Sequence, residues 1–194
     1  MTQYSKSERE AAAAVASMTA GKALERNEAL ELVRTSFGVT PDGLLIDEEI
    51  RRWFALFSPE SHAEDLARKR RAALLVMKAL RDWYPFLIGP VLSGAATASD
   101  IPEILLRGNE KEVELFLLSR EIDFDVLSSD TRNRHNTITL VTSAMGTDIL
   151  ITVSDRPKYP RSTSPDNLQH PVEAAGKADT NALEALLLQT NNED

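Results

Sequence analysis

The chain has no cysteine among its 194 residues. This absence excludes disulfide bridges and zinc sites built on cysteine thiolates. It also agrees with a reducing compartment, and we expect a cytoplasmic location. The three histidines, His62, His135 and His170, are too far apart in sequence to show the spacing of a histidine metal site.

Long apolar runs are missing as well. No stretch approaches the roughly 18 apolar residues that a membrane-spanning helix needs. The first ten residues are polar and charged, without the apolar segment of a secretory signal. We therefore expect neither a membrane span nor export.

Positive charge is in the minority, with 22 Lys and Arg against 30 Asp and Glu and a formal net charge of −8. Nucleic acid is disfavoured as a general partner, because neutralising phosphates requires clustered Lys and Arg. The basic run Arg68–Arg71 would point all round a helix, so we interpret it as solvated. Arg132, Arg134 and His135 are expected in an exposed turn from which they could reach a phosphate.

Several catalytic signatures are also absent. Gly21-Lys22 and Gly176-Lys177 are each followed by Ala and lack the upstream glycine of a P-loop, which disfavours a P-loop ATPase. No Gly-x-Ser-x-Gly elbow and no His-Glu-x-x-His motif is present. Serine-hydrolase and zinc-protease functions therefore have no support.

The composition is that of an ordinary globular domain, with 42% apolar and 27% charged residues. In residues 1–84 glycine is scarce and apolar residues recur near every 3.6 positions, which predicts a helical region. The predicted helices are Glu8–Met18, Asn27–Phe37 ending at Gly38, one capped by Asp47, and a long one from Ser61 that ends before Pro85.

Residues 85–155 change to a mixed pattern of strands and one helix. Asn109 is a candidate cap for that helix. Residues 156–194 begin with a proline-rich arm and continue into an amphipathic helix over Ala182–Gln189.

The fold class expected is α+β, with the N-terminal helical region packed on a small mixed sheet. The predicted strands are Phe86–Ile88, Ile101–Leu106, Ile122–Leu127, Thr137–Thr142 and Asp148–Val153, the last two forming a hairpin around Ala144–Gly146.

The stretch from Gly89 to Ile104 carries the most specific pattern. Gly89 and Gly94 follow a short strand, and Ser99-Asp100-Ile101 leads into the next one. This layout resembles the signature of polymerase-beta-like nucleotidyltransferases. In that family a strand ends in Gly-Ser, a second glycine opens the next helix, and the following strand brings in Asp-x-Asp. A third carboxylate comes from a later strand. The order of elements along the whole chain is similar to that of small bacterial nucleotidyltransferase-like proteins.

The resemblance implies a nucleotidyltransferase-type fold and transfer of a nucleotidyl group from a nucleoside triphosphate with Mg²⁺. Gly89, Gly94 and Ser99 would bind the nucleotide, because glycines let the backbone approach phosphates. Asp100 and Asp148 would be the catalytic carboxylates. Asp100, Glu103 and Asp148 would hold the metal, which clamps the attacking and leaving oxygens. Asp125 is the alternative to Asp148 as third carboxylate.

Two prolines depart from the family pattern. Pro90 stands where the family has Ser, and Pro102 stands where it has the second acid. Glu103 is next to that position, but neighbouring strand residues point to opposite faces unless a bulge re-aims them. A catalytically inactive relative that acts as a binding or regulatory interaction module is therefore the alternative function. A regulatory protein with a protein partner is a third possibility.

Overall fold

The computed structural model describes residues 4–130 and 137–190. Three helices come first: α1 (Lys6–Lys22), α2 (Arg26–Phe37) and α3 (Gly43–Phe57). A capping box between Ser5 and Glu8 starts α1, and Gly38 ends α2 in the left-handed conformation that glycine adopts without a Cβ penalty. These helices bury their own small apolar core, which consists mostly of Ala, Val, Leu and Ile side chains.

The start of α3 differs from the prediction. Asp47 was expected as the cap, but Asp42 caps the helix, and its carboxylate accepts a hydrogen bond from Leu44 N at 2.9 Å. Leu45 and Ile46 form the first turn and are buried in the helical core. The helix begins earlier because Asp42-Gly43 supplies the cap directly before an apolar run that the core can bury.

The long helix α4 (Pro59–Ala79) also begins earlier than predicted. Pro59 takes the first helical position, where its missing N–H costs nothing, so the helix begins two residues before Ser61. A short 3₁₀ turn, Arg81–Trp83, follows. Ala72, Ala73 and Met77 bury one side of α4 in the main hydrophobic core, together with residues of the sheet.

The sheet has five strands in the order β1-β2-β5-β4-β3. The pair β2/β5 is parallel, and the neighbouring pairs β1/β2, β4/β5 and β3/β4 are antiparallel. The mixed sheet expected from the sequence is thus confirmed. Its strands are β1 (Phe86–Ile88), β2 (Glu103–Arg107), β3 (Asp125–Asp130), β4 (Thr137–Ala144) and β5 (Thr147–Ser154).

The predicted hairpin is present as β4 and β5. Met145 and Gly146 turn the chain with φ of 53° and 70°, the positive values that a tight two-residue hairpin turn requires. The prediction for β3 is shifted, because the strand begins at Asp125. Ile122 and Phe124 lie before the strand and pack, partly buried, against the main core. Their apolar side chains at alternate positions therefore anchor a loop to the core and do not mark a strand.

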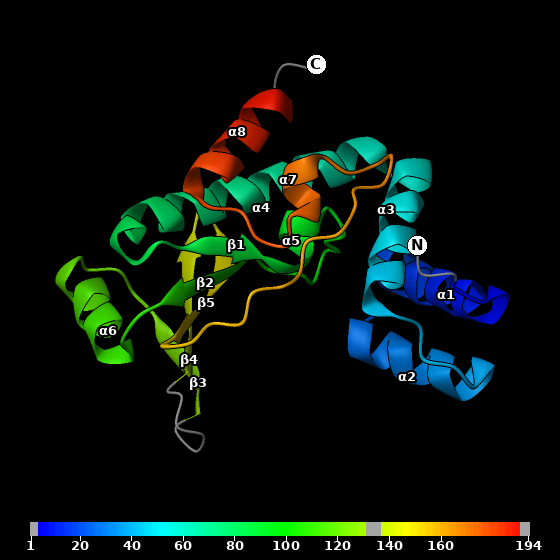
Figure 1. Ribbon diagram of the computed structural model, residues 1–194, viewed down its shortest axis with the longest axis horizontal. Helices are drawn as coiled ribbons and strands as arrows, with labels where there is room; N and C mark the ends of the chain where they lie inside the picture. Colours follow the sequence, from blue (N-terminus) through cyan, green and yellow to red (C-terminus); the bar gives the residue numbers. More distant parts are fainter. Residues whose placement is uncertain (1–3, 131–136, 191–194) are drawn as a thin grey trace.

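Helices cover one face of the sheet (Figure 1). Alternate residues of the central strands, among them Ile104, Leu106 and Ile151, face α4 and α8 (Thr180–Thr190) in the main core. The helix α6 (Glu110–Ser119), capped by Asn109 as predicted, packs against the same core. Among residues 4–130 and 137–190, no helix is both long and apolar enough to cross a membrane.

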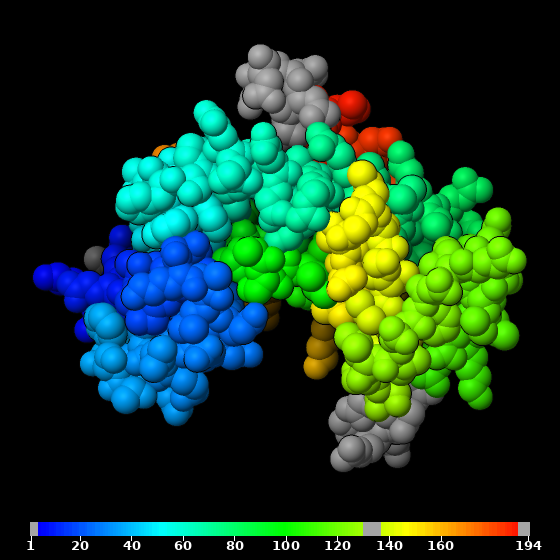
Figure 2. Space-filling view, turned by 180° about the vertical axis from the view of Figure 1, so that it is seen from behind, coloured from blue at the N-terminus to red at the C-terminus, as the bar shows by residue number. Residues whose placement is uncertain are grey.

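Two further elements position the site. The helix α5 (Gly89–Ser93) directly follows β1. Residues 155–170, which we call the strap, run without helix or strand from the end of β5 to α7 (Pro171–Ala174), as Figure 1 shows. Figure 2 shows a hollow between the N-terminal helices in blue and the strands in yellow, with the green α5–β2 segment at its base.

Candidate functional site

The carbonyls of α5 are held by a buried arginine. Arg70 donates from Nε to the carbonyl of Val91 at 2.9 Å and from Nη2 to that of Leu92 at 2.8 Å. Its side chain is only 3% exposed, and Glu173 of α7 balances its charge at 2.5 Å. Arg70 therefore fixes the last turn of α5 and joins it to α4 and α7.

The segment after α5 is held in the same way. Lys69 Nζ donates to the Thr97 carbonyl at 2.7 Å, and His62 Nε2 donates to the Ala96 carbonyl at 3.1 Å. The ring of His62 stacks on Phe54, with 3.8 Å between centroids. Burial lowers the pKa of His62, which keeps the ring neutral near its cationic neighbours.

The interpretation of Arg68–Arg71 as a solvated run is wrong for its two central members. Lys69 and Arg70 are buried, because each finds main-chain carbonyls and a carboxylate inside the fold. Arg68 remains on the surface, where it is paired with Asp65. A charge pattern in sequence carries no sign of such carbonyl partners, since they lie more than twenty positions further along the chain.

The two glycines of the predicted phosphate loop lie at opposite ends of α5. Gly89 begins the helix with φ of 75° and borders a cavity, whereas Gly94 ends it with φ of 80° and borders a separate, larger groove between α3 and α4. A Cβ on Gly94 would lie 3.4 Å from Oε1 of Glu173. Gly89 and Gly94 therefore do not line one phosphate cradle.

Asp100 closes a turn. Its Oδ2 accepts hydrogen bonds from Thr97 N and Thr97 Oγ1, both at 2.7 Å. The hydroxyl of Ser99 lies 3.1 Å from that of Thr97 and its residue is exposed. The carbonyl of Pro102, where the family would have an acid, accepts from Leu150 N at 2.9 Å. These contacts account for the segment as a structural turn into β2.

Glu103 lies directly behind Gly89. A Cβ on that glycine would be only 3.2 Å from Oε1 of Glu103, so glycine leaves room for this carboxyl. Burial raises the pKa of Glu103, the nearby Asp100 raises it further, and Arg26 opposes both. Metal ligands must be deprotonated, and the raised pKa makes deprotonation of this carboxyl more costly.

Asp148 stands apart from this pair. It is exposed near the start of β5, and its register partner is Ser143. Because Glu103 pairs with Leu150, Asp148 lies on the same sheet face as Glu103 but one diagonal step away. Asp125 belongs to β3, at the opposite edge of the sheet from β1. Within residues 4–130 and 137–190, no three acidic or histidine side chains gather into a group that could hold a metal ion.

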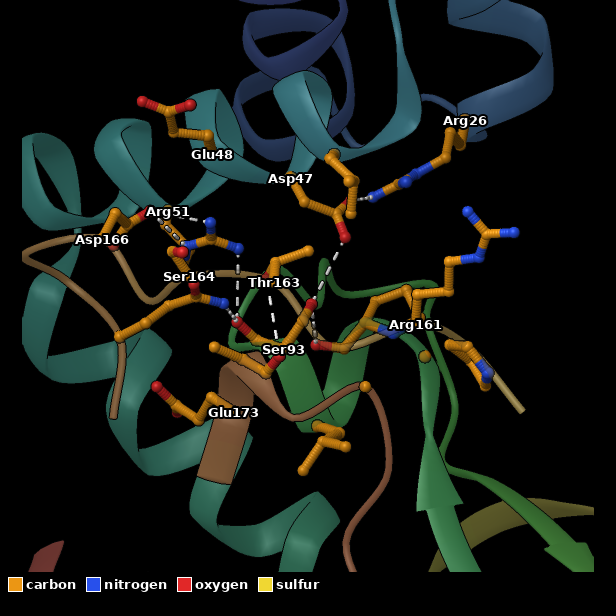
Figure 3. Close-up of a pocket in the computed structure, with 18 residues that line it drawn as sticks. Arg26, Asp47, Glu48, Arg51, Ser93, Arg161, Thr163, Ser164, Asp166 and Glu173 are labelled. Atoms are coloured by element: carbon orange, nitrogen blue, oxygen red, sulfur yellow. Dashed lines mark hydrogen bonds and ion pairs between the residues drawn. The ribbon is translucent and has the colours of Figure 1, made fainter. Parts of the chain in front are cut away.

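A cavity of about 290 Å³ opens on the other side of Gly89. It lies between α2, α3, α5 and the strap (Figure 3). The residues that give it donor character are three arginines and three hydroxyl side chains: Arg26, Arg51, Arg161, Ser93, Thr163 and Ser164. Neither Arg132, Arg134 nor His135 can be assigned to it, since they lie outside the described residues.

Two of the arginines are paired with acids of the cavity wall, Arg26 with Asp47 and Arg51 with Asp166. Arg26 Nη2 contacts Asp47 Oδ1 at 2.7 Å, and Asp47 also accepts from the Ser93 hydroxyl at 3.3 Å. The Nε of Arg26 is buried and has no hydrogen-bond partner among the described residues. Arg161 is exposed at the rim, and none of its contacts with described residues is a hydrogen bond or an ion pair.

The cavity residues carry no signal in the sequence. Arg26, Asp47 and Arg51 stand on ordinary helices, and Arg161 and Asp166 stand in the proline-rich arm, more than a hundred residues later. Only the path of the strap brings them together. The basic residues at its start and the Ser-Thr-Ser run over 162–164 were the nearest available pointers.

Comparisons of the chain with protein-family models, with curated proteins and with solved structures each find no match. The nucleotidyltransferase resemblance thus rests on the sequence pattern alone.

Proposed function

We propose that the protein is a non-catalytic relative of the nucleotidyltransferases that binds a nucleotide by its phosphates, with a nucleoside triphosphate as the ligand class. One observation carries this proposal. The cavity beside Gly89, where α5 follows β1, is lined by three arginines and three hydroxyl side chains as well as four acids, while the acids expected to bind metal do not converge.

The free donors of the cavity suit a phosphate. The buried Nε of Arg26 lacks a partner among the described residues, and Arg161 presents its guanidinium at the rim. Guanidinium groups bind phosphate oxygens through two parallel hydrogen bonds, and hydroxyls such as those of Thr163 and Ser164 add further donors. An anion at this place would satisfy the Arg26 donor.

The volume of the cavity determines which part of a nucleotide fits inside it. About 290 Å³ is at the lower limit of small-molecule sites, which run from about 300 to 1,000 Å³. The cavity therefore suits the phosphates and sugar of a nucleotide, with the base projecting beyond it. This geometry favours recognition of the phosphates over recognition of the base.

The acids present do not fit a metal held by the protein. Asp100 uses one carboxylate oxygen to close a turn, burial raises the pKa of Glu103 and so makes its deprotonation more costly, and Asp148 lies a diagonal step away. Mg²⁺ that arrives with a nucleoside triphosphate is coordinated largely by phosphate oxygens and water. We therefore expect binding of the nucleotide to depend little on these acids.

Catalysis is the second candidate, and one observation favours it. Glu103 and Asp148 share a sheet face near the starts of the neighbouring parallel strands β2 and β5. Two acids on one face of neighbouring strands are the arrangement from which the family's metal site would be built. Nucleotidyl transfer would then require these two acids to act together.

Calorimetry separates the two functions. The protein is titrated with each of the four common nucleoside triphosphates, with and without Mg²⁺, while pyrophosphate release is measured in parallel. The proposal predicts binding without pyrophosphate release. Replacing Arg161 or Arg26 by Ala should weaken binding about tenfold, the value of a charged hydrogen bond, whereas Arg9→Ala on the exposed surface of α1 should not.

Two results would decide against it. Absence of binding at millimolar concentrations of protein and nucleotide would refute both functions. Pyrophosphate release that disappears in Glu103→Gln and Asp148→Asn would establish the catalytic function instead.

A further inference from the structure

Arg51 is the most deeply placed cation of the cavity. It stands on α3 with its side chain 9% exposed. Its Nη1 donates to the carbonyl of Ser93 at 3.3 Å, which fixes the plane of the guanidinium against the end of α5. The remaining edge of the guanidinium, formed by Nε and Nη2, faces the strap (Figure 3). That edge has the two parallel donors with which arginine binds a carboxylate or a phosphate.

A carboxylate of the protein itself occupies this edge. Asp166 of the strap accepts from Arg51 Nε at 3.2 Å and from Nη2 at 2.8 Å, in both cases through Oδ2. The other oxygen, Oδ1, accepts from Leu168 N at 2.8 Å. Asp166 is less buried than Arg51, with 23% of its side chain exposed. The acid thus stands on the solvent side of the pair.

The strap meets the end of α5 at a second point. Gln169 donates from Nε2 to the carbonyl of Ser93 at 3.0 Å, so Arg51 and Gln169 share one acceptor. Further along, Thr163 N donates to the Ala174 carbonyl at 2.8 Å, and the close approach of Gly176 to the Pro160 and Arg161 carbonyls leaves no room for a Cβ. The strap is therefore anchored on both sides of Asp166.

We propose that Arg51 is a phosphate-binding residue of the cavity and that Asp166 competes with the ligand for it. This inference rests on the proposed function. A phosphate group that enters the cavity takes the place of the Asp166 carboxylate on the Nε and Nη2 edge. Arg51 keeps an anionic partner throughout, which a buried cation requires. The strap turn around Asp166 is released as the phosphate binds.

The replacement of Asp166 by phosphate on Arg51 sets the apparent affinity of the cavity for phosphate. The intrinsic affinity for phosphate is reduced by the fraction of molecules in which Asp166 has left Arg51. Removing the charge of Asp166 should therefore tighten binding, although it also weakens the strap. If Asp166 only stabilised the strap, removing its charge would loosen the cavity wall and weaken phosphate binding instead.

The test titrates inorganic triphosphate into wild type, Asp166→Asn and a control. Glu184→Gln is the matched control, because it removes one negative charge from α8, where Glu184 pairs with Lys78 away from the cavity. Calorimetry gives the affinity, and circular dichroism shows that each variant is folded. Hydrogen exchange of the wild-type strap is followed with and without triphosphate. We expect binding at least fivefold tighter in Asp166→Asn, no change in Glu184→Gln, and faster exchange at Leu168 and Gln169 on binding.

Each outcome either supports or overturns the competition between Asp166 and phosphate for Arg51. Triphosphate that binds Asp166→Asn but not wild type also supports the competition. Equal or weaker binding by Asp166→Asn than by wild type overturns the competition and leaves the proposed function standing. Failure of wild type and variant alike to bind any triphosphate overturns both. Should Asp166→Asn fail to fold, hydrogen exchange in wild type decides, and unchanged or slower exchange at Leu168 overturns the competition.

Discussion

Arg70 and Glu173 form an ion pair inside the protein, with 2.5 Å between Nη2 and Oε1 and side chains 3% and 10% exposed. The pair joins α4 to α7 across the end of α5. Glu173 also accepts from the main-chain N–H of His170, so it fixes the start of α7. Arg70 and Glu173 thus join α7, which follows the strap, to the long helix α4.

Glu173→Gln should lower the free energy of unfolding by about 3 kcal/mol, because it leaves the buried Arg70 without a counter-charge. The matched variant Glu184→Gln removes a partner of Lys78 from a pair that is about half exposed, and should cost less than about 1 kcal/mol. Urea denaturation of both variants measures the difference. Equal losses in the two variants would show that the interior pair has no special weight.

Asp100→Ala should lower the free energy of unfolding by about 1–2 kcal/mol, because two hydrogen bonds from Thr97 are lost. Nucleotide affinity should stay within about twofold of wild type, since a turn residue is not a ligand. Denaturation and calorimetry check the two halves. Asp148→Ala, an exposed position, serves as the control for stability. Loss of nucleotide binding with an intact fold would return Asp100 to the metal-binding role that the resemblance implies.

Glu103 should make the protein less stable at neutral than at acidic pH. Burial raises its pKa, so the folded state holds the proton more tightly than the unfolded chain. Stability is therefore lost as the pH rises from the ordinary value of about 4.3 through the raised pKa. Glu103→Gln should be more stable than wild type at about pH 7 and should lose that advantage below about pH 4. Denaturation at both pH values measures this difference in the free energy of unfolding. An advantage of Glu103→Gln that is independent of pH would contradict a raised pKa for Glu103.

His62 should have the opposite dependence. Burial lowers its pKa, the neighbouring Arg70 and Lys69 lower it further, and the Ala96 carbonyl and Asp65 oppose them. The folded state therefore binds the proton less tightly, and stability is lost as the pH falls below about 6.5 through the lowered pKa. His62→Gln should flatten the pH dependence of the unfolding free energy between about pH 7 and pH 5. An unchanged slope would mean that another group governs it.

The local parts of the fold could be predicted from the sequence. The end of α2 at Gly38, the cap at Asn109 and the Met145-Gly146 turn depend on backbone preferences of single residues. The segment after β1 was expected as a glycine turn, whereas it forms the short helix α5, for which Pro90 after Gly89 is a helix-start signal. Each of these features is settled within a few residues of the chain.

The candidate site could not be predicted in the same way. The burial of Lys69 and Arg70 depends on carbonyls that arrive with α5 and the segment after it. The Arg51–Asp166 pair joins residues 115 positions apart, and no periodicity links them. Charged side chains are expected in water until a partner is known. The site therefore becomes visible only once the strap has been placed across α5.

The decisive experiment for phosphate binding in the cavity is a crystal structure of the protein grown with a nucleoside triphosphate and Mg²⁺. We expect an intact triphosphate in the cavity beside Gly89, in contact with Arg26 and Arg161. A nucleotide bound elsewhere, or Mg²⁺ bridging Glu103 and Asp148, would contradict it.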